Sequence, residues 1–147
     1  MTDKIITRQI VYNSSEYKQE IELRNRILKI PLGLNIYDLN LEEEIDDFHL
    51  GCFYENKLIA VLVLTKINDS KIQMRQVAVN ELYQGRNIGK KLVEFSEIFL
   101  LQKGFSKIVL NARKNVVPFY EKLGYYSVGE EFIEVFIPHL RMEKKLK

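Results

Sequence analysis

Three consecutive strands are predicted in the middle of the chain from the positions of its apolar residues. Residues 49–55, 57–66 and 71–79 are rich in β-branched, aromatic and other apolar side chains. The turn residues Glu55-Asn56 and Asn68-Asp69-Ser70 separate them. Strands joined by such short turns pair side by side in opposite directions. This part of the sequence therefore predicts an antiparallel meander.

The third strand, KIQMRQVAV at residues 71–79, contains a break in its alternation. The two-residue period of apolar side chains slips by one between Met74 and Val77. An extra residue at Arg75-Gln76 would return each side chain to its proper face, which is what a β-bulge does. A bulge also bends a strand and leaves backbone N–H and C=O groups free for a ligand. A polar edge position at Gln76 is the alternative, and we favour the bulge.

A first helix is predicted before the meander, over residues 16–29. Ser14 or Ser15 can cap its N-terminus, and Pro31 and Gly33 stop it. Shorter patterns on this side of the meander predict a strand over residues 5–12 and a short helix or turn over residues 41–48.

Two more helices are predicted after the meander. Residues 87–103 form the first, which ends at Gly104. Its inner stripe consists of Ile88, Leu92, Phe95, Ser96 and Phe99. Asn115 can cap the other helix, whose first turn holds Pro118 and whose end is Gly124. A buried strand over residues 107–112 lies between the helices, and strands over residues 125–135 and 139–146 close the chain.

This order of elements predicts an α/β fold with one domain over residues 1–147. A meander followed by helix, strand and helix gives a mixed, mostly antiparallel central sheet, flanked by helices on both faces and with at least one right-handed crossover. The 147 residues, 46% of them hydrophobic and 29% charged, suffice to bury one core. No repeat or Pro/Gly-rich linker marks a second domain.

Composition and charge argue against several classes of protein. A net charge of +2 argues against a nucleic-acid partner. The single Cys52 excludes an internal disulfide, and with only His49 and His139 we expect no metal site. The longest apolar run, residues 58–64, is too short to cross a membrane, and the N-terminus lacks the apolar core of a signal peptide. We therefore expect a cytoplasmic protein without a membrane partner.

The stretch between the third strand and the following helix has the composition of a phosphate-binding loop. Gly85 and Gly89 allow a ligand to approach the backbone, and Asn87 tolerates a positive φ. Arg86 and Lys90 stand at a helix N-terminus, where their charge opposes the helix dipole. A bound pyrophosphate would turn this penalty of roughly 0.3–1 kcal/mol per charge into charge-assisted hydrogen bonds. The alternative is a solvated helix start with ordinary surface lysines.

This loop resembles the acetyl-CoA loop of the GCN5-related N-acetyltransferase (GNAT) superfamily, whose pattern is Gln/Arg-x-x-Gly-x-Gly/Ala. Gln84, Asn87 and Gly89 occupy the three defined positions, with Asn87 in place of the middle glycine. The segments QVAV, IVLNA and NVVPFYEKLGYYSVGE follow in the superfamily's order, so that the resemblance covers residues 48–146. The segments LRNRIL, DDFHL and GEEFIEVFIPHLRM are similar to those of the ElaA-like branch.

The resemblance implies an enzyme that moves an acetyl group from acetyl-CoA directly to an amine. It implies that backbone groups of Val77 and Val79 pair with the pantetheine and the acetyl carbonyl, and that the amides of residues 85–90 hold the pyrophosphate. Tyr120 matches the residue that protonates the departing thiolate, and a tyrosine, whose ordinary pKa is about 10, carries a proton at neutral pH. The implied coenzyme-binding residues are Val77, Ala78, Val79, Gln84, Gly85, Arg86, Asn87, Ile88, Gly89, Lys90, Asn111, Asn115, Phe119 and Tyr120.

The general base and the acceptor amine stay open. The candidates for the base are Glu131, Glu134, His49 and His139, each of which can instead be a structural residue. We expect the first helix and residues 30–48 to line the acceptor pocket, but they contain no motif that identifies the amine. The alternatives to an enzyme are a non-catalytic acetyl-CoA-binding or sensing module and a binding domain for another phosphate ligand. Exposed strand edges at the C-terminus are compatible with a homodimer.

Overall fold

One mixed sheet organises the structure, a computed structural model that describes residues 4–147. Its strand order is β1-β2-β3-β4-β5-β7-β6. The strands are β1 (Ile5–Gln9), β2 (Phe48–Tyr54), β3 (Lys57–Lys66), β4 (Lys71–Val79), β5 (Lys107–Arg113), β6 (Tyr126–Glu134) and β7 (Ile137–Lys145). Neighbouring strands are antiparallel except β4 and β5, which are parallel. The prediction of a mixed, mostly antiparallel sheet is confirmed.

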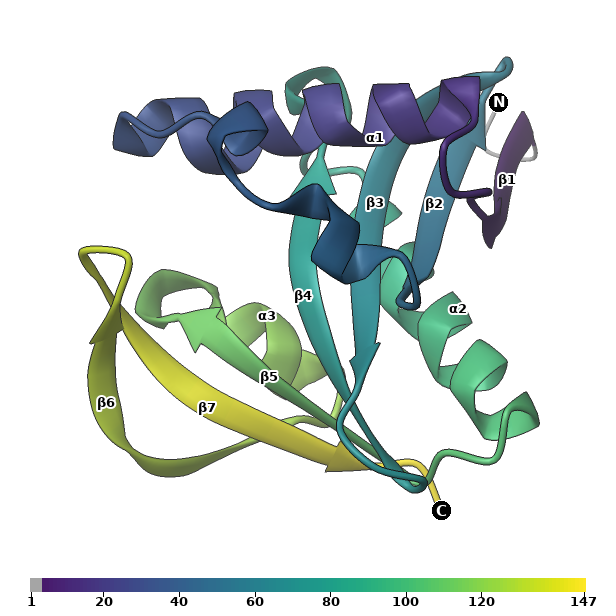
Figure 1. Cartoon of the computed structure of the whole chain (residues 1–147). Coiled ribbons are helices and arrows are strands. Elements are labelled where there is room, and N and C mark those ends of the chain that lie inside the picture. The colour runs from purple at the N-terminus through teal and green to yellow at the C-terminus, as the bar shows by residue number, and fades with distance from the viewer. Residues whose placement is uncertain (1–3) are drawn as a thin grey trace.

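Helices cover both faces of this sheet (Figure 1). On one face, α1 (Ser15–Arg24) packs against β3 and β4. On the other face, α2 (Ile88–Gln102) packs against β2, β3 and β4, and α3 (Val117–Lys122) lies behind β5. No helix in the described part of the chain has the length and apolar character that crossing a membrane requires.

The two layers are held by successive residues of the buried strand β3. Leu62 packs in a cluster with Leu92 of α2, whereas its neighbour Val61 packs in a second cluster with Ile21 of α1. Leu62, Val61 and Leu92 are all fully buried. Adjacent strand residues point to opposite faces, so a continuously apolar strand can build both cores.

The bulge predicted in β4 is present. Gln76 has a φ of 55°, and the pairing of β3 with β4 jumps from Val61↔Ala78 to Val63↔Arg75, which leaves an extra residue on β4. In the described chain, the parallel ladder between β4 and β5 ends at Met74, two residues before the bulge. Beyond this point the two strands separate (Figure 1).

The predicted ends of β3 and β4 agree with the structure, and so does the hairpin turn between β2 and β3. Glu55 and Asn56 have φ values of 51° and 66°, as a turn with two left-handed residues requires. The helix predicted over residues 16–29 is helical throughout but changes type. It continues after α1 as a π-helical segment, Asn25–Lys29, before the 3₁₀ turn Ile30–Leu32.

The prediction that Asn115 caps a helix is wrong. Asn115 lies inside a 3₁₀ turn, Lys114–Val116, and α3 begins only at Val117, with no side-chain cap. The 3₁₀ turn continues directly into α3, and Pro118 stands in the first turn, where a missing N–H costs nothing. The predicted end of this helix is confirmed, since Gly124 follows it with a φ of 94°.

Candidate active site

The loop between β4 and α2 exposes the N-terminus of a long helix. Gly85 and Asn87 both adopt left-handed backbone conformations, with φ values of 77° and 63°. α2 starts at Ile88, and no side chain of the described residues caps its first turn. The first backbone N–H groups of the helix therefore point out of its end without an intrahelical partner. The Gln84 amide donates a hydrogen bond of 3.0 Å to the Val79 carbonyl, which fixes the start of the loop to the end of β4.

A cavity of about 410 Å³ lies against this loop, and we call it the loop cavity. It is lined by Ile27, Val77, Val79, Tyr83, Gln84, Gly85, Asn87, Ile88, Gly89, Lys90, Val116, Phe119 and Tyr120. An added Cβ atom on Gly89 would stand 3.5 Å from Phe119 and 3.7 Å from Val79. A longer side chain at Gly89 would therefore extend between these two residues and occupy the cavity.

A second cavity, about 260 Å³ in volume, lies where β4 and β5 separate, and we call it the sheet cavity. Its walls come from the π-helical segment, from both sides of the separation and from the turn between β6 and β7. Val77, Val116 and Tyr120 line both cavities. The loop cavity and the sheet cavity therefore meet at the bulged part of β4.

Tyr120 stands at this junction and is held on two sides by aromatic rings. Phe119 and Tyr125 contact it edge-on, with ring centroids 5.0 and 5.6 Å away. Its side chain is buried, and burial raises the pKa of its hydroxyl well above the ordinary value. Tyr120 therefore keeps its proton over the whole neutral and moderately alkaline range.

His139 and Glu134 line the sheet cavity from β7 and β6. His139 Nδ1 lies 2.8 Å from the carbonyl oxygen of Ile137. A carbonyl oxygen only accepts hydrogen bonds, so Nδ1 carries the hydrogen and neutral His139 has its lone pair on Nε2. Glu134 lies 3.7 Å from Nε2 and accepts a hydrogen bond of 3.1 Å from Asn111. This arrangement can accept a proton at His139 Nε2.

Several residues implied by the resemblance lie outside the loop cavity. Ala78 is buried under α1, and its backbone pairs with Val61 of β3. Arg86 and Asn115 are exposed and line neither cavity. Asn111 lines the sheet cavity instead. Sequence reasoning missed Ile27, Tyr83 and Val116 in the lining of the loop cavity, although Val116 lies within the matched segment NVVPFYEKLGYYSVGE.

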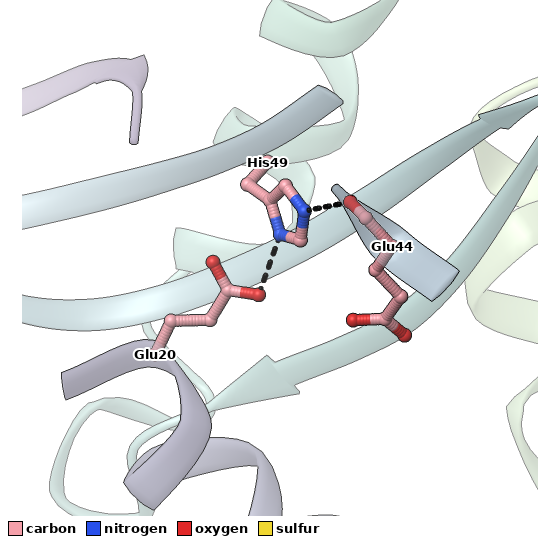
Figure 2. A group of neighbouring side chains, drawn as sticks. All are labelled: Glu20, Glu44 and His49. Carbon is pink, nitrogen blue, oxygen red and sulfur yellow. Dashed lines mark hydrogen bonds and ion pairs between the residues drawn. The ribbon is translucent and has the colours of Figure 1, made fainter. Parts of the chain in front are cut away.

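Two of the candidate bases also lie elsewhere. Glu131 is exposed and forms an ion pair of 2.9 Å with Lys114. His49 is buried on the α1 face, where its Nδ1 donates to Glu20 (2.7 Å) and its Nε2 donates to the Glu44 carbonyl (3.0 Å) (Figure 2). Both ring nitrogens thus face acceptors, which requires the protonated ring.

The carboxylates around His49 belong to a buried charge network. Arg24 donates to both oxygens of Glu44, at 2.8 and 2.9 Å, and to Glu20 at 2.9 Å. Burial alone would lower the pKa of His49, but its bonds to Glu20 and Glu44 raise it. Glu20, Glu44 and His49 each have an atom that could bind a metal ion, and these atoms lie within 4.8 Å of one another. The Arg24 guanidinium already supplies the positive charge between these carboxylates, which disfavours a cation there.

Arg24 also connects this network to the bulge. Its Nε lies 3.3 Å from the side-chain oxygen of Gln76, the residue with positive φ in β4. A left-handed backbone at a non-glycine residue costs free energy and persists where neighbours hold it. The hydrogen bond from α1 therefore supports the strand shape that forms the junction of the two cavities.

Comparison with known proteins gives one family. The sequence pattern of the family described as Acetyltransferase (GNAT) domain matches residues 35–146. Among curated proteins, the uncharacterized N-acetyltransferase YitI of Bacillus subtilis is 29% identical over 133 residues, which cover 86% of this chain and 89% of YitI.

Solved structures share the fold at low sequence identity. An aminoglycoside 6'-N-acetyltransferase complexed with coenzyme A aligns with a TM-score of 0.79 and 16% identity, covering 97% of each chain. Escherichia coli ElaA aligns with a TM-score of 0.77 and 18% identity, covering 95% of this chain and 97% of ElaA. The likeness extends over nearly the whole chain, including the elements that form both cavities.

Proposed function

We propose that this chain, which belongs to the GNAT family of acetyltransferases, transfers an acetyl group from acetyl-CoA directly to an amine within one ternary complex. The observation that carries the proposal is the junction at Tyr120, where the loop cavity and the sheet cavity meet. One cavity can hold the coenzyme and the other the amine, so that thioester and nucleophile lie next to each other.

The loop cavity suits the diphosphate and pantetheine of the coenzyme. The uncapped N-terminus of α2 provides backbone donors and the positive end of a helix dipole, and Lys90 adds a charge. Val77 and Val79 follow the bulge at the edge of the cavity, where their strand has lost its β5 partner. The related fold of the aminoglycoside 6'-N-acetyltransferase binds coenzyme A, which supports the same co-substrate here.

The transfer has three steps, and side chains of this protein act in two of them. The unprotonated amine attacks the thioester carbonyl, and alignment of the two reactants can supply roughly 7–11 kcal/mol of the barrier reduction. His139 Nε2 accepts the amine proton, directly or through a water. As the C–S bond breaks, the hydroxyl of Tyr120 gives its proton to the sulfur.

Two measurements test the proposal. Calorimetry with acetyl-CoA should show saturable binding, and an assay for released thiol across a panel of amines should show turnover. Binding without turnover on any amine would favour the non-catalytic sensing module over the enzyme. Absence of saturable binding would rule out both functions.

The proposal includes a cytoplasmic homodimer. The single cysteine, Cys52, is a buried thiol, which suits a reducing compartment.

The proposed dimer rests on the edge of the sheet. β6 is an edge strand, and Val128 and Ile133 on it are exposed. Edge strands with exposed apolar side chains tend to pair with another chain. Sedimentation equilibrium should give a dimer mass, and Ile133→Lys should shift the equilibrium toward monomer.

A further inference from the structure

The charged side chains that line the sheet cavity are mainly cationic. Lys29 comes from the π-helical segment, Arg75 from β4 and Arg113 from the end of β5. Glu134 is the one carboxylate in the lining that the structure describes, and His139 lines the same cavity. The charge of this cavity therefore depends on which cations already have partners.

Arg75 has its partners within the protein. Its guanidinium lies 3.6 Å from Glu44 and 3.7 Å from Asp47, and it donates a hydrogen bond of 3.2 Å to Thr65. These contacts hold it toward β3 and the buried charge network. Arg75 therefore adds little uncompensated charge to the cavity.

Lys29 and Arg113 differ from Arg75 in this respect. Within residues 4–147, neither side chain forms an ion pair or a hydrogen bond, although both are half-buried. Burial, and then the positive charges of Arg24, Arg75 and Arg113, lower the pKa of Lys29. The two free cations thus act on one another, and an anion between them would relieve the repulsion.

The proton-accepting groups face the same cavity from the neighbouring strands. Arg113 pairs directly with His139 across β5 and β7, and His139 pairs with Phe132 of β6. Glu134 lies two residues after Phe132 and so points to the same face of the sheet. One cavity therefore contains a site for an amine, at Glu134 and His139, and two unpaired cations beside it.

We infer that the acceptor amine also carries an anionic group, a carboxylate or a phosphate, which Lys29 and Arg113 bind. The inference rests on the proposed function and specifies its substrate class. The anionic group forms charge-assisted hydrogen bonds with the two cations and fixes the amine toward His139. A polyamine or an aminoglycoside, which carries several positive charges, is repelled by the same pair.

Matched amines test the inference. Ethanolamine is compared with O-phosphoethanolamine, alaninamide with alanine, and spermidine serves as the polycationic probe, with rates expressed per unprotonated amine. We expect kcat/KM for the anionic member of at least one pair to exceed that of its neutral partner about tenfold or more. The pair with the larger ratio identifies phosphate or carboxylate as the group bound.

Variants connect the preference to the two cations. Arg113→Gln and Lys29→Gln should each reduce kcat/KM for the preferred anionic amine about tenfold, and change that for its neutral partner less than about twofold. Arg113→Lys retains the charge and should restore part of the loss. Lys114→Gln is the matched control, because Lys114 is the exposed neighbour of Arg113, is paired with Glu131 and lies outside the cavity. It should leave both rates unchanged.

Failure of this inference can be told from failure of the proposed function. Turnover with a preference for neutral amines or spermidine overturns the inference and leaves the acetyltransferase activity standing. If acetyl-CoA binds but none of these amines is acetylated, calorimetry of O-phosphoethanolamine and alanine with the coenzyme-saturated protein tests whether the anionic group is bound. Saturable binding that Arg113→Gln abolishes supports the inference, and absence of binding by both probes overturns it.

Discussion

Tyr120 and His139 show how the surroundings of single residues set their roles. Burial raises the pKa of Tyr120, so its hydroxyl is a proton donor and not a base at neutral pH. The Ile137 carbonyl fixes the hydrogen of His139 on Nδ1 and leaves Nε2 as a proton acceptor. Neither property can be derived from residue type, because the first depends on how the chain packs around Tyr120 and the second on the position of the Ile137 carbonyl at the start of β7.

Tyr120→Phe should lower kcat while leaving coenzyme binding intact. The variant retains the ring that Phe119 and Tyr125 contact but removes the proton for the departing thiolate. Loss of a general acid reduces kcat by about 100-fold or more. Single-turnover thiol release and calorimetry with coenzyme A measure the two effects separately. The control is Tyr125→Phe, which removes a hydroxyl bonded to Glu97 outside both cavities. Full activity of Tyr120→Phe would contradict the assigned role.

His139→Gln should slow the transfer at neutral pH and recover at higher pH. Without the proton acceptor, the proton of the attacking amine must pass to the solvent, and hydroxide, the stronger acceptor there, becomes more abundant as pH rises. We expect kcat/KM at neutral pH to fall by about 100-fold. The ratio of wild-type to variant rates, measured from neutral to alkaline pH, should decrease steadily. A ratio that stays constant with pH would indicate a purely structural role.

At the scale of elements, the sequence predicted the strands and the bulge of β4 but not the local changes in helix type. β3 and β4 were predicted to their ends because turn residues bound them, Glu55-Asn56 before β3 and Asn68-Asp69-Ser70 between the two strands. The bulge at Gln76 was predicted because it leaves a visible slip in that alternation. The cap at Asn115 was wrong because a 3₁₀ turn competes with a capped helix, and residue preferences do not separate the two.

The widening of the first helix after Arg24 also had no signal in the sequence. In the π-helical segment, the Asn25 side chain accepts a hydrogen bond of 2.9 Å from the backbone N–H of Ile36. This tertiary contact joins the segment to a later turn. Such widening occurs often at functional sites, and here it places Lys29 in the wall of the sheet cavity.

The contact between α1 and the bulge of β4 gives a prediction at the same scale. Arg24→Gln leaves Glu20 and Glu44 buried without their cation and weakens the support of Gln76. We expect the free energy of unfolding to fall by about 3–5 kcal/mol, measured by urea titration. Arg26→Gln is the matched control in the same helical segment, since Arg26 forms an exposed ion pair with Glu81. The free energy of unfolding of Arg26→Gln should fall much less, and equal decreases in the two variants would contradict the role of burial.

At the scale of the whole molecule, the sheet cavity is the part that sequence reasoning could not assemble, although it named Glu134 and His139 singly. Its cations come from residues 29 and 113, and its proton acceptors come from residues 134 and 139. No local spacing joins these positions, because the long crossover through α2 brings β5 beside β4. The loop between β4 and α2 could be identified from the sequence as a candidate site because its residues are contiguous. The one local signal for the cavity was the polar pair Asn111 and Arg113, which alternate on one face of β5.

The buried network around His49 makes the stability of the whole fold depend on pH. Hydrogen bonds to Glu20 and to the Glu44 carbonyl raise the pKa of His49 above the unfolded value of about 6.5, although burial opposes them. The stabilisation is therefore complete below about pH 6.5 and is lost as pH rises through the folded pKa. Urea titrations from neutral to alkaline pH should show this decline. In His49→Gln, whose side chain cannot titrate, this decrease of the free energy of unfolding with pH should be absent. The same decrease in wild type and variant would contradict the role of His49.

The short parallel ladder between β4 and β5 has a consequence for motion. Four consecutive pairs, from Lys71↔Lys107 to Met74↔Leu110, join the N-terminal and C-terminal parts of the sheet within the described chain. A movement of β4 relative to β5 beyond these pairs would break no hydrogen bond of this ladder. A molecule that contacts both β4 and β5 in the sheet cavity would restrict this movement. In the coenzyme-saturated protein, amide hydrogens of Asn111 and Ala112, which line the sheet cavity, should then exchange more slowly with O-phosphoethanolamine bound, whereas those of β2 should exchange at the same rate.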